Sequence, residues 1–322
     1  MPIYNNNHHI PLELAIWLAH DTYDHTDNNI STTALLRPLK QILLAERVEV
    51  DPEVDILTNF ASAIGTAIHS AVEDAWIKHA SKNLSLLGIP ENTIKSILVN
   101  PDPTDLTSKS IPIYLERRSF KEIDGHTVSG KFDFVVNGSV KDIKSTKTYS
   151  YGKTDKYGSY IMQGSIYRWL NQDIITSDEM SILFVFTDWS AGKAAYTKGY
   201  PETPITEVKL KLISIEETEE YIREKLKQIH DLKDAPESNI PACTDKELWM
   251  DASVWKYYKN PAKTTRATKK YDSLSEATIR LIDDGSIGLI KEVKGMAKAC
   301  GWCPANSICE QKHKLMQEGL LQ

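Results

Sequence analysis

The sequence predicts an α/β fold in which a central mixed β-sheet is flanked by helices and followed by a small cysteine-containing C-terminal appendage. Three observations predict this: an Asn137-Gly138 pair between two strand-like segments, strand and helix patterns in succession around it, and a change of composition after Asp234. Strands followed by helices and a further strand are typical of a sheet covered by helices. We therefore expect a core with an N-terminal helical part over residues 1–240 and an appendage over residues 241–322.

Two helical patterns precede the predicted sheet. The first lies within residues 29–47, where Ser31 is a good N-cap before apolar residues at helical spacing. The second lies within residues 54–80 and carries His69. A polar, proline-containing stretch, residues 89–110, is interpreted as a connection.

Strands and further helices follow this connection. The strand patterns lie at residues 111–115, 126–136, 139–145, 182–187 and 208–213, and the helical patterns at residues 160–170 and 216–232. Short apolar or alternating runs bounded by turn residues are typical of strands, and longer amphipathic runs are typical of helices. In the appendage, the capping box Ser273-x-x-Glu276 predicts one more helix.

The Asn137-Gly138 pair is the strongest local signal, because this dipeptide favours a two-residue hairpin loop. Pairing outward from that loop brings Asp133 opposite Asp142. Like charges opposite each other on neighbouring strands destabilise a sheet unless something neutralises them. Lys144 points to the same face as Asp142 by strand alternation. The sequence therefore predicts a site where a divalent cation bridges two carboxylates beside a lysine.

These residues belong to an ordered set along the chain. The set is His69, Glu116, Gly130-x-x-Asp133, Asp142-Ile143-Lys144 and Gln163-x-x-x-Tyr167. It resembles the PD-(D/E)XK nuclease superfamily, and more closely its RecB-like exonuclease branch, which includes the AddB nuclease domain and the CRISPR-adaptation nucleases. The resemblance spans roughly residues 30–170 and implies a restriction-endonuclease-like core.

The resemblance implies a metal site. Asp133, Asp142 and the backbone carbonyl of Ile143 would bind Mg²⁺ or Mn²⁺, with His69 as a further ligand. Hard oxygen ligands and an incomplete protein shell suit Mg²⁺, which keeps several waters. A metal-activated water would then attack the phosphodiester bond in line.

The resemblance also implies catalytic roles for the other members of the set. Lys144 would orient the attacking water and offset the charge that develops on the phosphate. Gln163 and Tyr167 would position the scissile strand or the lysine. Glu116 would hold a second metal or orient the metal ligands.

Each of these residues also has a plainer interpretation. Asp133 and Asp142 would be two solvent-facing carboxylates, although aspartate is depleted in strands. His69 would be a hydrogen-bonded histidine at a helix interface. Gln163 and Tyr167 would be one face of an amphipathic helix.

The activity implied is that of a metal-dependent DNA exonuclease in recombination, repair or replication. Its substrate would be DNA that is single-stranded or has free ends, and a helicase or a single-strand annealing or binding protein would be its partner. The compact chain suits a stand-alone enzyme encoded by a phage, acting in the cytoplasm of a bacterium or of the infected host. A structure-specific or restriction-type endonuclease on the same fold and a non-catalytic DNA-binding module are the alternatives.

The chain has four cysteines: Cys243, Cys300, Cys303 and Cys309. Four thiolates fit tetrahedral Zn²⁺ or an iron–sulfur cluster, and unliganded buried thiols are a third interpretation. The spacing of the last three is similar to that of the motif that holds a four-iron four-sulfur (4Fe-4S) cluster in AddB-like and CRISPR-adaptation nucleases, which favours iron. In those relatives a first cysteine precedes the core, whereas no cysteine precedes Cys243 here. We therefore expect a structural cluster that closes the appendage alone.

The distribution of charge along the sequence indicates how the protein could contact DNA. A net charge of -6 and a pI near 5.9 argue against a protein that coats nucleic acid by bulk electrostatics, so that any DNA contact must be local. Within residues 255–271, six lysines and arginines alternate with Tyr257 and Tyr258. Basic and aromatic side chains together suit a path for single-stranded DNA, and an ordinary solvated hairpin is the alternative.

The sequence also bears on the compartment. The first residues lack the features of a secretory signal, and no apolar run reaches the length that spans a membrane. We therefore expect a cytoplasmic protein without membrane contact.

Overall fold

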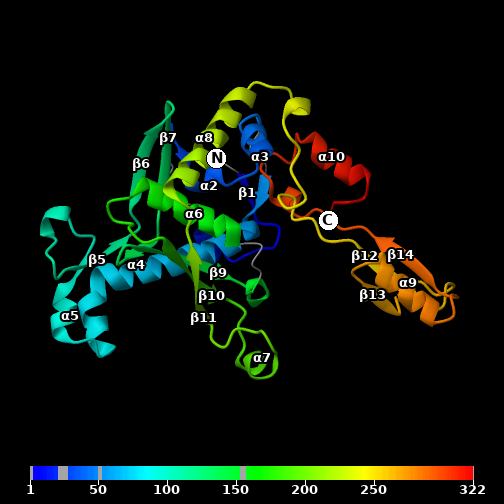
Figure 1. Ribbon diagram of the computed structural model, residues 1–322, viewed down its shortest axis with the longest axis horizontal. Helices are drawn as coiled ribbons and strands as arrows, with labels where there is room; N and C mark the ends of the chain where they lie inside the picture. The colour runs from blue at the N-terminus through cyan, green and yellow to red at the C-terminus, as the bar shows by residue number, and fades with distance from the viewer. Residues whose placement is uncertain (1–2, 21–27, 50–52, 153–156, 322) are drawn as a thin grey trace. The chain divides into compact units, whose positions relative to one another are not determined.

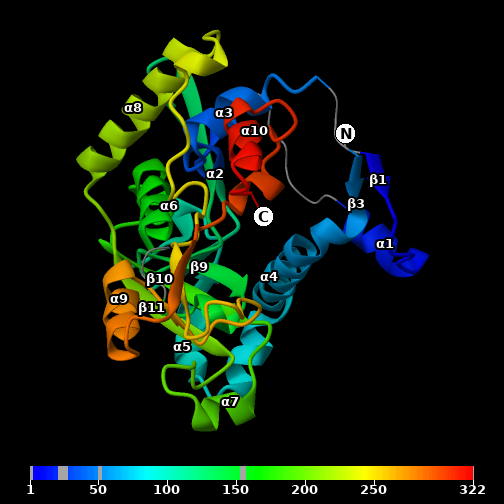
Figure 2. The same ribbon diagram turned by 90° about the vertical axis from the view of Figure 1, so that its right-hand side faces the viewer.

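The computed structural model describes residues 3–20, 28–49, 53–152 and 157–321 (Figure 1 and Figure 2). It divides into two compact units. Unit 1 comprises Met1–Leu36 and Asp51–Lys227, and unit 2 comprises Arg37–Val50 and Gln228–Gln322. This division differs from the expected boundary after residue 240, because an N-terminal segment belongs with the C-terminal part and the boundary falls inside a helix, α8 (Ile215–Leu232).

Unit 1 is built around a six-stranded mixed β-sheet, counted over the described residues. In spatial order its strands are β11 (Ile205–Lys211), β10 (Glu179–Phe186), β9 (Ser139–Thr146), β8 (Phe134–Val136), β5 (Ile111–Leu115) and β4 (Ile97–Val99). The pairs β9–β10 and β4–β5 are parallel, and the other neighbouring pairs are antiparallel. The predicted mixed sheet flanked by helices is therefore confirmed.

Helices cover both faces of this sheet. On one face, α6 (Tyr157–Leu170) contributes Tyr167 to a core cluster with Val140 and Ile182. On the other, Trp76 of α4 (Phe60–Leu86) packs against Phe134, with the ring centroids 6.2 Å apart. Figure 2 shows the two helices on either side of β9. Because side chains alternate along a strand, successive residues of β9 face different helices.

The remaining described elements of unit 1 are short. A three-stranded sheet contains β2 (Ile30–Ser31), β7 (His126–Lys131) and β6 (Arg118–Ile123), and a parallel pair contains β1 (Ile3–Asn5) and β3 (Glu53–Asp55). The other helices of this unit are α1 (Leu12–Ala19), α2 (Thr32–Leu35), α5 (Glu91–Ser96), α7 (Ala191–Tyr196) and the first part of α8. None of the helices described is long and apolar enough to cross a membrane.

Unit 2 combines one N-terminal helix with the C-terminal elements. These are α3 (Leu39–Ala45), β12 (Val254–Tyr258), β13 (Lys269–Tyr271), α9 (Leu274–Asp283), β14 (Leu289–Val293) and α10 (Glu310–Gln317). The three strands form one antiparallel sheet in the order β13-β12-β14. The predicted helix cap is confirmed, because the Ser273 hydroxyl accepts a 3.2 Å hydrogen bond from the backbone N–H of Glu276 at the start of α9.

The hairpin between β8 and β9 has the predicted loop and register. Val136 pairs with Ser139, so that Asn137 and Gly138 form the two-residue loop. Their φ angles are 50° and 73°. Two successive left-handed residues define the type I′ turn that matches the twist of the flanking strands. The local sequence therefore determines which residues of the two strands face each other.

Two predicted elements are each divided in the structure. The helix expected within residues 29–47 is two helices, α2 and α3, because Pro38 has no backbone N–H and disfavours a helical conformation at the residue before it. Ser31 nevertheless caps α2 as predicted, accepting a hydrogen bond from Ala34. The strand expected over residues 126–136 is two strands, β7 and β8, which belong to different sheets.

Two further elements correct the sequence interpretation. The stretch taken as a connection, residues 89–110, contains α5 and β4, and β4 is only three residues long. The strand β6 was not predicted at all. Its sequence, Arg118–Ile123, is mostly polar, and it is defined by its antiparallel pairing with β7 and not by an apolar pattern.

The substitution Gly138→Ala should destabilise the protein more than Gly125→Ala. Both glycines have φ in the left-handed region, 73° and 77°, which costs an alanine about 1 kcal/mol. A Cβ on Gly138 would also lie 2.2 Å from Thr176 Oγ1, whereas one on Gly125 meets nothing within 4 Å. Urea denaturation should show losses of about 1 kcal/mol for Gly125→Ala and about 2–3 kcal/mol for Gly138→Ala. Equal losses would contradict the close approach of Thr176.

Candidate active site

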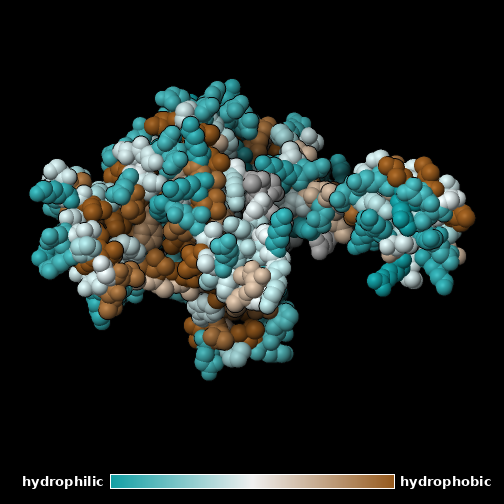
Figure 3. All heavy atoms as spheres, turned by 60° about the horizontal axis from the view of Figure 1, so that its bottom comes forward, coloured by the Kyte–Doolittle hydropathy of each residue, from teal (hydrophilic) through white to brown (hydrophobic). Residues whose placement is uncertain are grey.

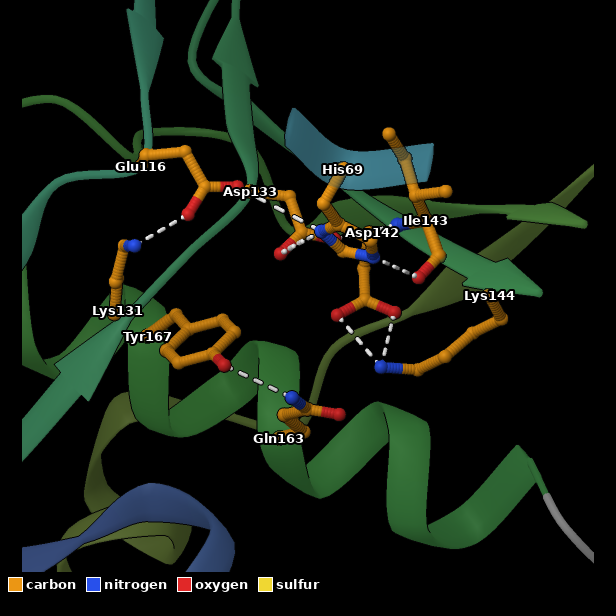
Figure 4. A network of polar contacts seen from close by, with 9 residues as sticks. All are labelled: His69, Glu116, Lys131, Asp133, Asp142, Ile143, Lys144, Gln163 and Tyr167. Atoms are coloured by element: carbon orange, nitrogen blue, oxygen red, sulfur yellow. Dashed lines mark hydrogen bonds and ion pairs between the residues drawn. The ribbon is translucent and has the colours of Figure 1, made fainter. Parts of the chain in front are cut away.

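The candidate site lies where the β8–β9 hairpin meets α4 and α6. Successive residues of β9 point to opposite faces of the sheet. Ile143 packs in the cluster that includes residues of α4, whereas the Lys144 ammonium lies 5.7 Å from the ring centroid of Tyr160 on α6. Figure 4 shows Asp142 and Lys144 directed toward each other above α6.

Asp142 is a buried carboxylate, with 1% of its surface exposed. Its partner is Lys144, whose Nζ lies 2.7 Å from Oδ2 and 3.0 Å from Oδ1. Oδ2 is fully buried and accepts no hydrogen bond of good geometry within the described structure. Its negative charge is therefore compensated by the ion pair with the Lys144 ammonium. Burial alone would lower the pKa of Lys144, but the charge of Asp142, its hydrogen bond and the charge of Asp133 together raise that pKa. A buried carboxylate with one cation is a strong site for positive charge.

Asp133 lies immediately beyond the end of the β8–β9 ladder. The last ladder pair is Phe134–Lys141, so that Asp133 and Asp142 flank this pair and do not themselves form a ladder pair. The Asp133 Oδ2 atom accepts a 2.7 Å hydrogen bond from the backbone N–H of Ile143. Burial and the charge of Asp142 raise the pKa of Asp133 to about 7. The two carboxylates are therefore close enough to oppose each other's ionisation.

His69 connects α4 to this pair. Its Nδ1 lies 3.5 Å from Asp133 Oδ1 and 3.6 Å from Glu116 Oε1, and its Nε2 lies 3.2 Å from the carbonyl oxygen of Ile143. The contact with Glu116 raises the pKa of His69. One ligand atom from each of His69, Glu116 and Asp133 lies within 4.8 Å of the other two, close enough to bind one metal ion.

Glu116 follows β5 directly and is held in an unusual conformation. Its φ is 49°, in the left-handed region, and its backbone N–H donates to the carbonyl oxygen of Asp133. Lys131, at the end of β7, lies 2.6 Å from its Oε2. Although burial raises the pKa of Glu116, His69 and Lys131 together bring it below its usual value. This carboxylate is therefore ionised and supported by two cationic or donor groups.

Gln163 and Tyr167 form the wall that α6 presents to the site. Gln163 Nε2 donates a 2.8 Å hydrogen bond to the Tyr167 hydroxyl, one helical turn away. Gly130 permits β7 to approach this helix, because a Cβ there would lie 2.6 Å from Thr32 Oγ1 and 3.0 Å from Tyr167 Cδ1. This explains physically why a glycine precedes Asp133 by three residues.

The site opens into a cleft of about 960 Å³ that lies within unit 1. Lys144 and Asp133 line its wall, together with residues of α1, α2, α4 and β7. Arg118 and Lys131 add basic groups to the lining, and Trp17 adds an aromatic ring. A cleft of this size, with convergent charged groups and a carboxylate whose pKa is strongly shifted, is typical of an active site.

The structure thus brings the whole predicted set into one region, with one difference in how its members group. His69, Asp133 and the Ile143 carbonyl lie together, as the expected metal set requires. The compact three-residue group nevertheless includes Glu116, and the Asp142 carboxylate is directed at Lys144 (Figure 4). The Lys144 ammonium therefore lies beside Asp142, the carboxylate that the sequence analysis assigned to the metal.

Two residues of the site were not identified from the sequence. Lys131 stands two residues before Asp133, and Tyr160 stands three residues before Gln163 on the same helix. Both spacings place a side chain near a neighbour of the predicted set. The signal was therefore present, but only the contacts with Glu116 and Lys144 distinguish these residues from ordinary surface positions.

The four cysteines line a separate cavity within unit 2. Helix α3 contributes Lys40 and Leu44 to the same lining, so that an N-terminal segment takes part although it carries no cysteine. The expectation that the cysteines close the C-terminal appendage alone therefore needs correction. Burial raises the pKa of Cys243 to about 12 and also raises the pKa of Cys300. All four cysteines are free thiols in this structure.

The basic stretch at residues 255–271 does not offer a stacking platform, which was one of the two interpretations of its sequence. Tyr257 and Tyr258 are 0% and 6% exposed. The Tyr257 hydroxyl donates a 2.8 Å hydrogen bond to Asp284 at the end of α9. These rings belong to the packing of the three-stranded sheet, and they are not available to bases.

Comparisons with known proteins give no family. No protein-family model matches the chain, and no curated protein matches it either. The structure is similar to that of SSO0001, with a TM-score of 0.40 and 14% identity, over 68% of this chain and 86% of that one. It is also similar to a phage-related exonuclease from Haemophilus somnus 129PT, with a TM-score of 0.26 and 18% identity, over 37% of this chain and 58% of that one. Likenesses this low do not indicate a function, so that the function has to be inferred from the residues of the site.

In the absence of divalent cations, the contribution of Asp133 to the free energy of unfolding should fall as the pH rises from about 4 to about 7. The pKa of Asp133 is about 7 in the folded protein, against an ordinary value of 3.8. The folded state therefore binds more protons than the unfolded state in this window, and stability decreases with rising pH. Asp133→Asn should remove this part of the pH dependence in urea denaturation with EDTA.

The exposed Asp173→Asn serves as the matched control for this measurement. It should leave the wild-type slope unchanged. Identical slopes for wild type and Asp133→Asn would show that Asp133 does not titrate in this window.

Proposed function

We propose that this protein is a metal-dependent deoxyribonuclease that hydrolyses phosphodiester bonds. The observation that carries the proposal is the buried Asp142–Lys144 pair beside Asp133 and His69, at the wall of a large cleft. Neighbouring carboxylates that are shielded from solvent favour a bound proton or a bound cation, because their charges oppose each other. The ordered sequence set and the resemblance it carries support the same reaction.

The donor set fits a hard divalent cation. Asp142 Oδ2 is buried without a hydrogen bond, and His69, Glu116 and Asp133 bring three ligand atoms within 4.8 Å of one another. We propose that Asp133, Asp142, His69 and the Ile143 carbonyl bind Mg²⁺ or Mn²⁺. A bound cation of this kind supplies an activated water and charge stabilisation at the phosphate.

The protein's own groups would position the substrate phosphate. Lys144 is kept charged by Asp142, so that its ammonium is available to offset negative charge that develops during cleavage. Burial and Asp142 raise the pKa of Asp133 in the metal-free protein, and a bound cation would favour its ionised form as a ligand. Glu116 fixes the orientation of His69, and the Gln163–Tyr167 pair limits the cleft on the side of α6.

We further propose that the enzyme acts on DNA that is single-stranded or has free ends, as an exonuclease in recombination, repair or replication. This narrower assignment follows from the resemblance of the ordered motif set to the RecB-like branch. The same resemblance supports a cytoplasmic enzyme of a bacterium or a phage, and a helicase or a single-strand annealing or binding protein as a partner.

We also propose that the four cysteines hold a structural 4Fe-4S cluster. The thiols line one cavity, and Cys243 and Cys300 pack among apolar residues that include Leu248 and Ala297. Tetrahedral zinc would bring its sulfur ligands within about 4 Å of one another. The spacing Cys300-x2-Cys303-x5-Cys309, which is similar to that of the 4Fe-4S motif, nevertheless favours iron over zinc. Lys40, Arg37 and Lys312 place positive charge near the thiols.

The central test is cleavage of end-labelled linear DNA with Mg²⁺, with Mn²⁺ or with EDTA. Wild type should shorten the DNA only with metal, and Asp142→Ala and Lys144→Ala should each reduce the rate by at least about 100-fold. Lys141→Ala is the matched control, because Lys141 neighbours Asp142 but pairs with Glu207, 2.7 Å away. It should cleave at the wild-type rate. Full activity of Lys144→Ala, with circular dichroism showing intact protein, would refute the assignment.

The substrate's ends separate an exonuclease from an endonuclease. A covalently closed circle should resist the enzyme, whereas the same DNA made linear should be degraded. Cleavage of the closed circle would establish an endonuclease on the same site.

Anaerobically purified protein should contain iron and absorb near ~400 nm. Cys243→Ser and Cys300→Ser should lose both the iron and the absorbance, and they should lower the melting temperature because the cavity is left unfilled. Elemental analysis distinguishes the alternatives. Stoichiometric zinc without iron, or neither metal, would overturn the iron–sulfur proposal without affecting the nuclease proposal.

A further inference from the structure

The antiparallel sheet of unit 2 carries a row of three lysines. Lys256 on the central strand β12 pairs with Lys270 on β13 and with Lys291 on β14. Residues in direct register on neighbouring strands point to the same face, with Cβ atoms about 4.5–5.5 Å apart. The three side chains therefore stand side by side across the whole width of the sheet.

This arrangement is unfavourable unless an anion neutralises it, because like charges directly opposite each other destabilise a strand pair. None of the three lysines forms an ion pair with any residue in the ranges that the structure describes. By contrast, Lys259 on the same segment lies 3.5 Å from Asp284. Lys270 and Lys291 are exposed, and Lys256 is half-buried.

The row lies on the face of the sheet that does not pack against α9. Tyr257 marks the α9 side, because its hydroxyl donates to Asp284 at the end of that helix. Side chains alternate along β12, so that Lys256 points to the opposite side. Lys269, next to Lys270, points with Tyr257 toward the α9 side, in register across the ladder.

Within the three described strands no acidic side chain points to this face, and the exposed Asp272 directly follows β13. The rows on either side of the lysines are Val254–Val293 and Tyr258–Leu289. Glu292 is in register with Trp255 and therefore points to the α9 side. Figure 3 shows hydrophilic atoms over most of the visible surface of the part that contains β12, β13, β14 and α9. Glu276 and Asp283 lie on α9, and Asp284 directly follows this helix and accepts the hydrogen bond from Tyr257.

We infer that the row of Lys270, Lys256 and Lys291 is a docking surface for the phosphate backbone of a nucleic acid. Strands are about 4.8 Å apart, so that the row is about 10 Å long, and one strand of duplex DNA carries about three phosphates over that length. The contact is electrostatic and independent of sequence, because Tyr257 and Tyr258 are buried and cannot stack on bases. It does not depend on the cleavage chemistry proposed above.

The test measures DNA binding by the full-length protein in EDTA, so that cleavage does not interfere. Fluorescence anisotropy of labelled single-stranded and duplex oligonucleotides is followed over a range of salt concentrations. The triple variant Lys256→Gln, Lys270→Gln, Lys291→Gln should bind at least about tenfold more weakly. The slope of log K against log salt should fall in magnitude by about 2 for a single strand and by nearly 3 for a duplex.

Neighbouring residues on one strand provide the matched control. Lys270→Gln and Lys269→Gln make the same change of charge at adjacent positions on opposite faces of β13. Lys270→Gln should weaken binding and reduce the salt slope by about 0.7–0.9, and Lys269→Gln should leave both unchanged. Circular dichroism melting confirms that each variant is folded.

Three outcomes would overturn the inference. The first is wild-type DNA affinity and salt slope in the folded triple variant. The second is equal weakening by Lys269→Gln and Lys270→Gln, which would show that overall charge and not this row is responsible. The third concerns vesicles of anionic phospholipid, whose binding is measured in parallel. Loss of vesicle binding in the triple variant, with DNA binding unchanged, would exclude a nucleic-acid surface.

Discussion

The candidate site depends on the burial of two carboxylates, Asp133 and Asp142, at the end of one short β-hairpin. A buried charge is costly unless a partner compensates it, and a second carboxylate beside it increases the cost. Lys144 meets part of this requirement from the same strand, with its ammonium 2.7 Å from Asp142. The pKa of Asp133 is raised, which indicates that the negative charge of this carboxylate is not fully compensated. A site with such a deficit attracts a cation, and this property underlies the proposed chemistry.

The rest of unit 1 positions groups around that deficit. Helix α4 brings His69 to Asp133 and to the Ile143 carbonyl, from the face of the sheet opposite to α6. Helix α6 can approach because position 130 is a glycine, and it limits the cleft with Tyr167. Both helices pack on the sheet through apolar clusters, so that the hydrophobic core and the polar site share the same elements. A change in this packing would therefore move the ligand atoms.

Unit 2 presents two features that do not depend on this site. The cysteine cavity is lined from both parts of the chain, because Pro38 ends the helical pattern and begins α3, which contributes Lys40 to the lining. The three-stranded sheet carries a row of three lysines in direct register. The cavity underlies the proposed cluster site, and the lysine row underlies the proposed nucleic-acid surface.

The sequence by itself determined the loop and register of the β8–β9 hairpin, since two-residue turns depend on local backbone conformation at Asn137 and Gly138. It also indicated the mixed sheet flanked by helices. Only the tertiary structure decided that His69 contacts Glu116, that Lys131 pairs with it, and that residues 126–136 divide between two sheets. The lysine row likewise required the pairing of Lys256 with Lys291. Such contacts join residues far apart in the chain, and local periodicity carries no information about which distant elements pack together.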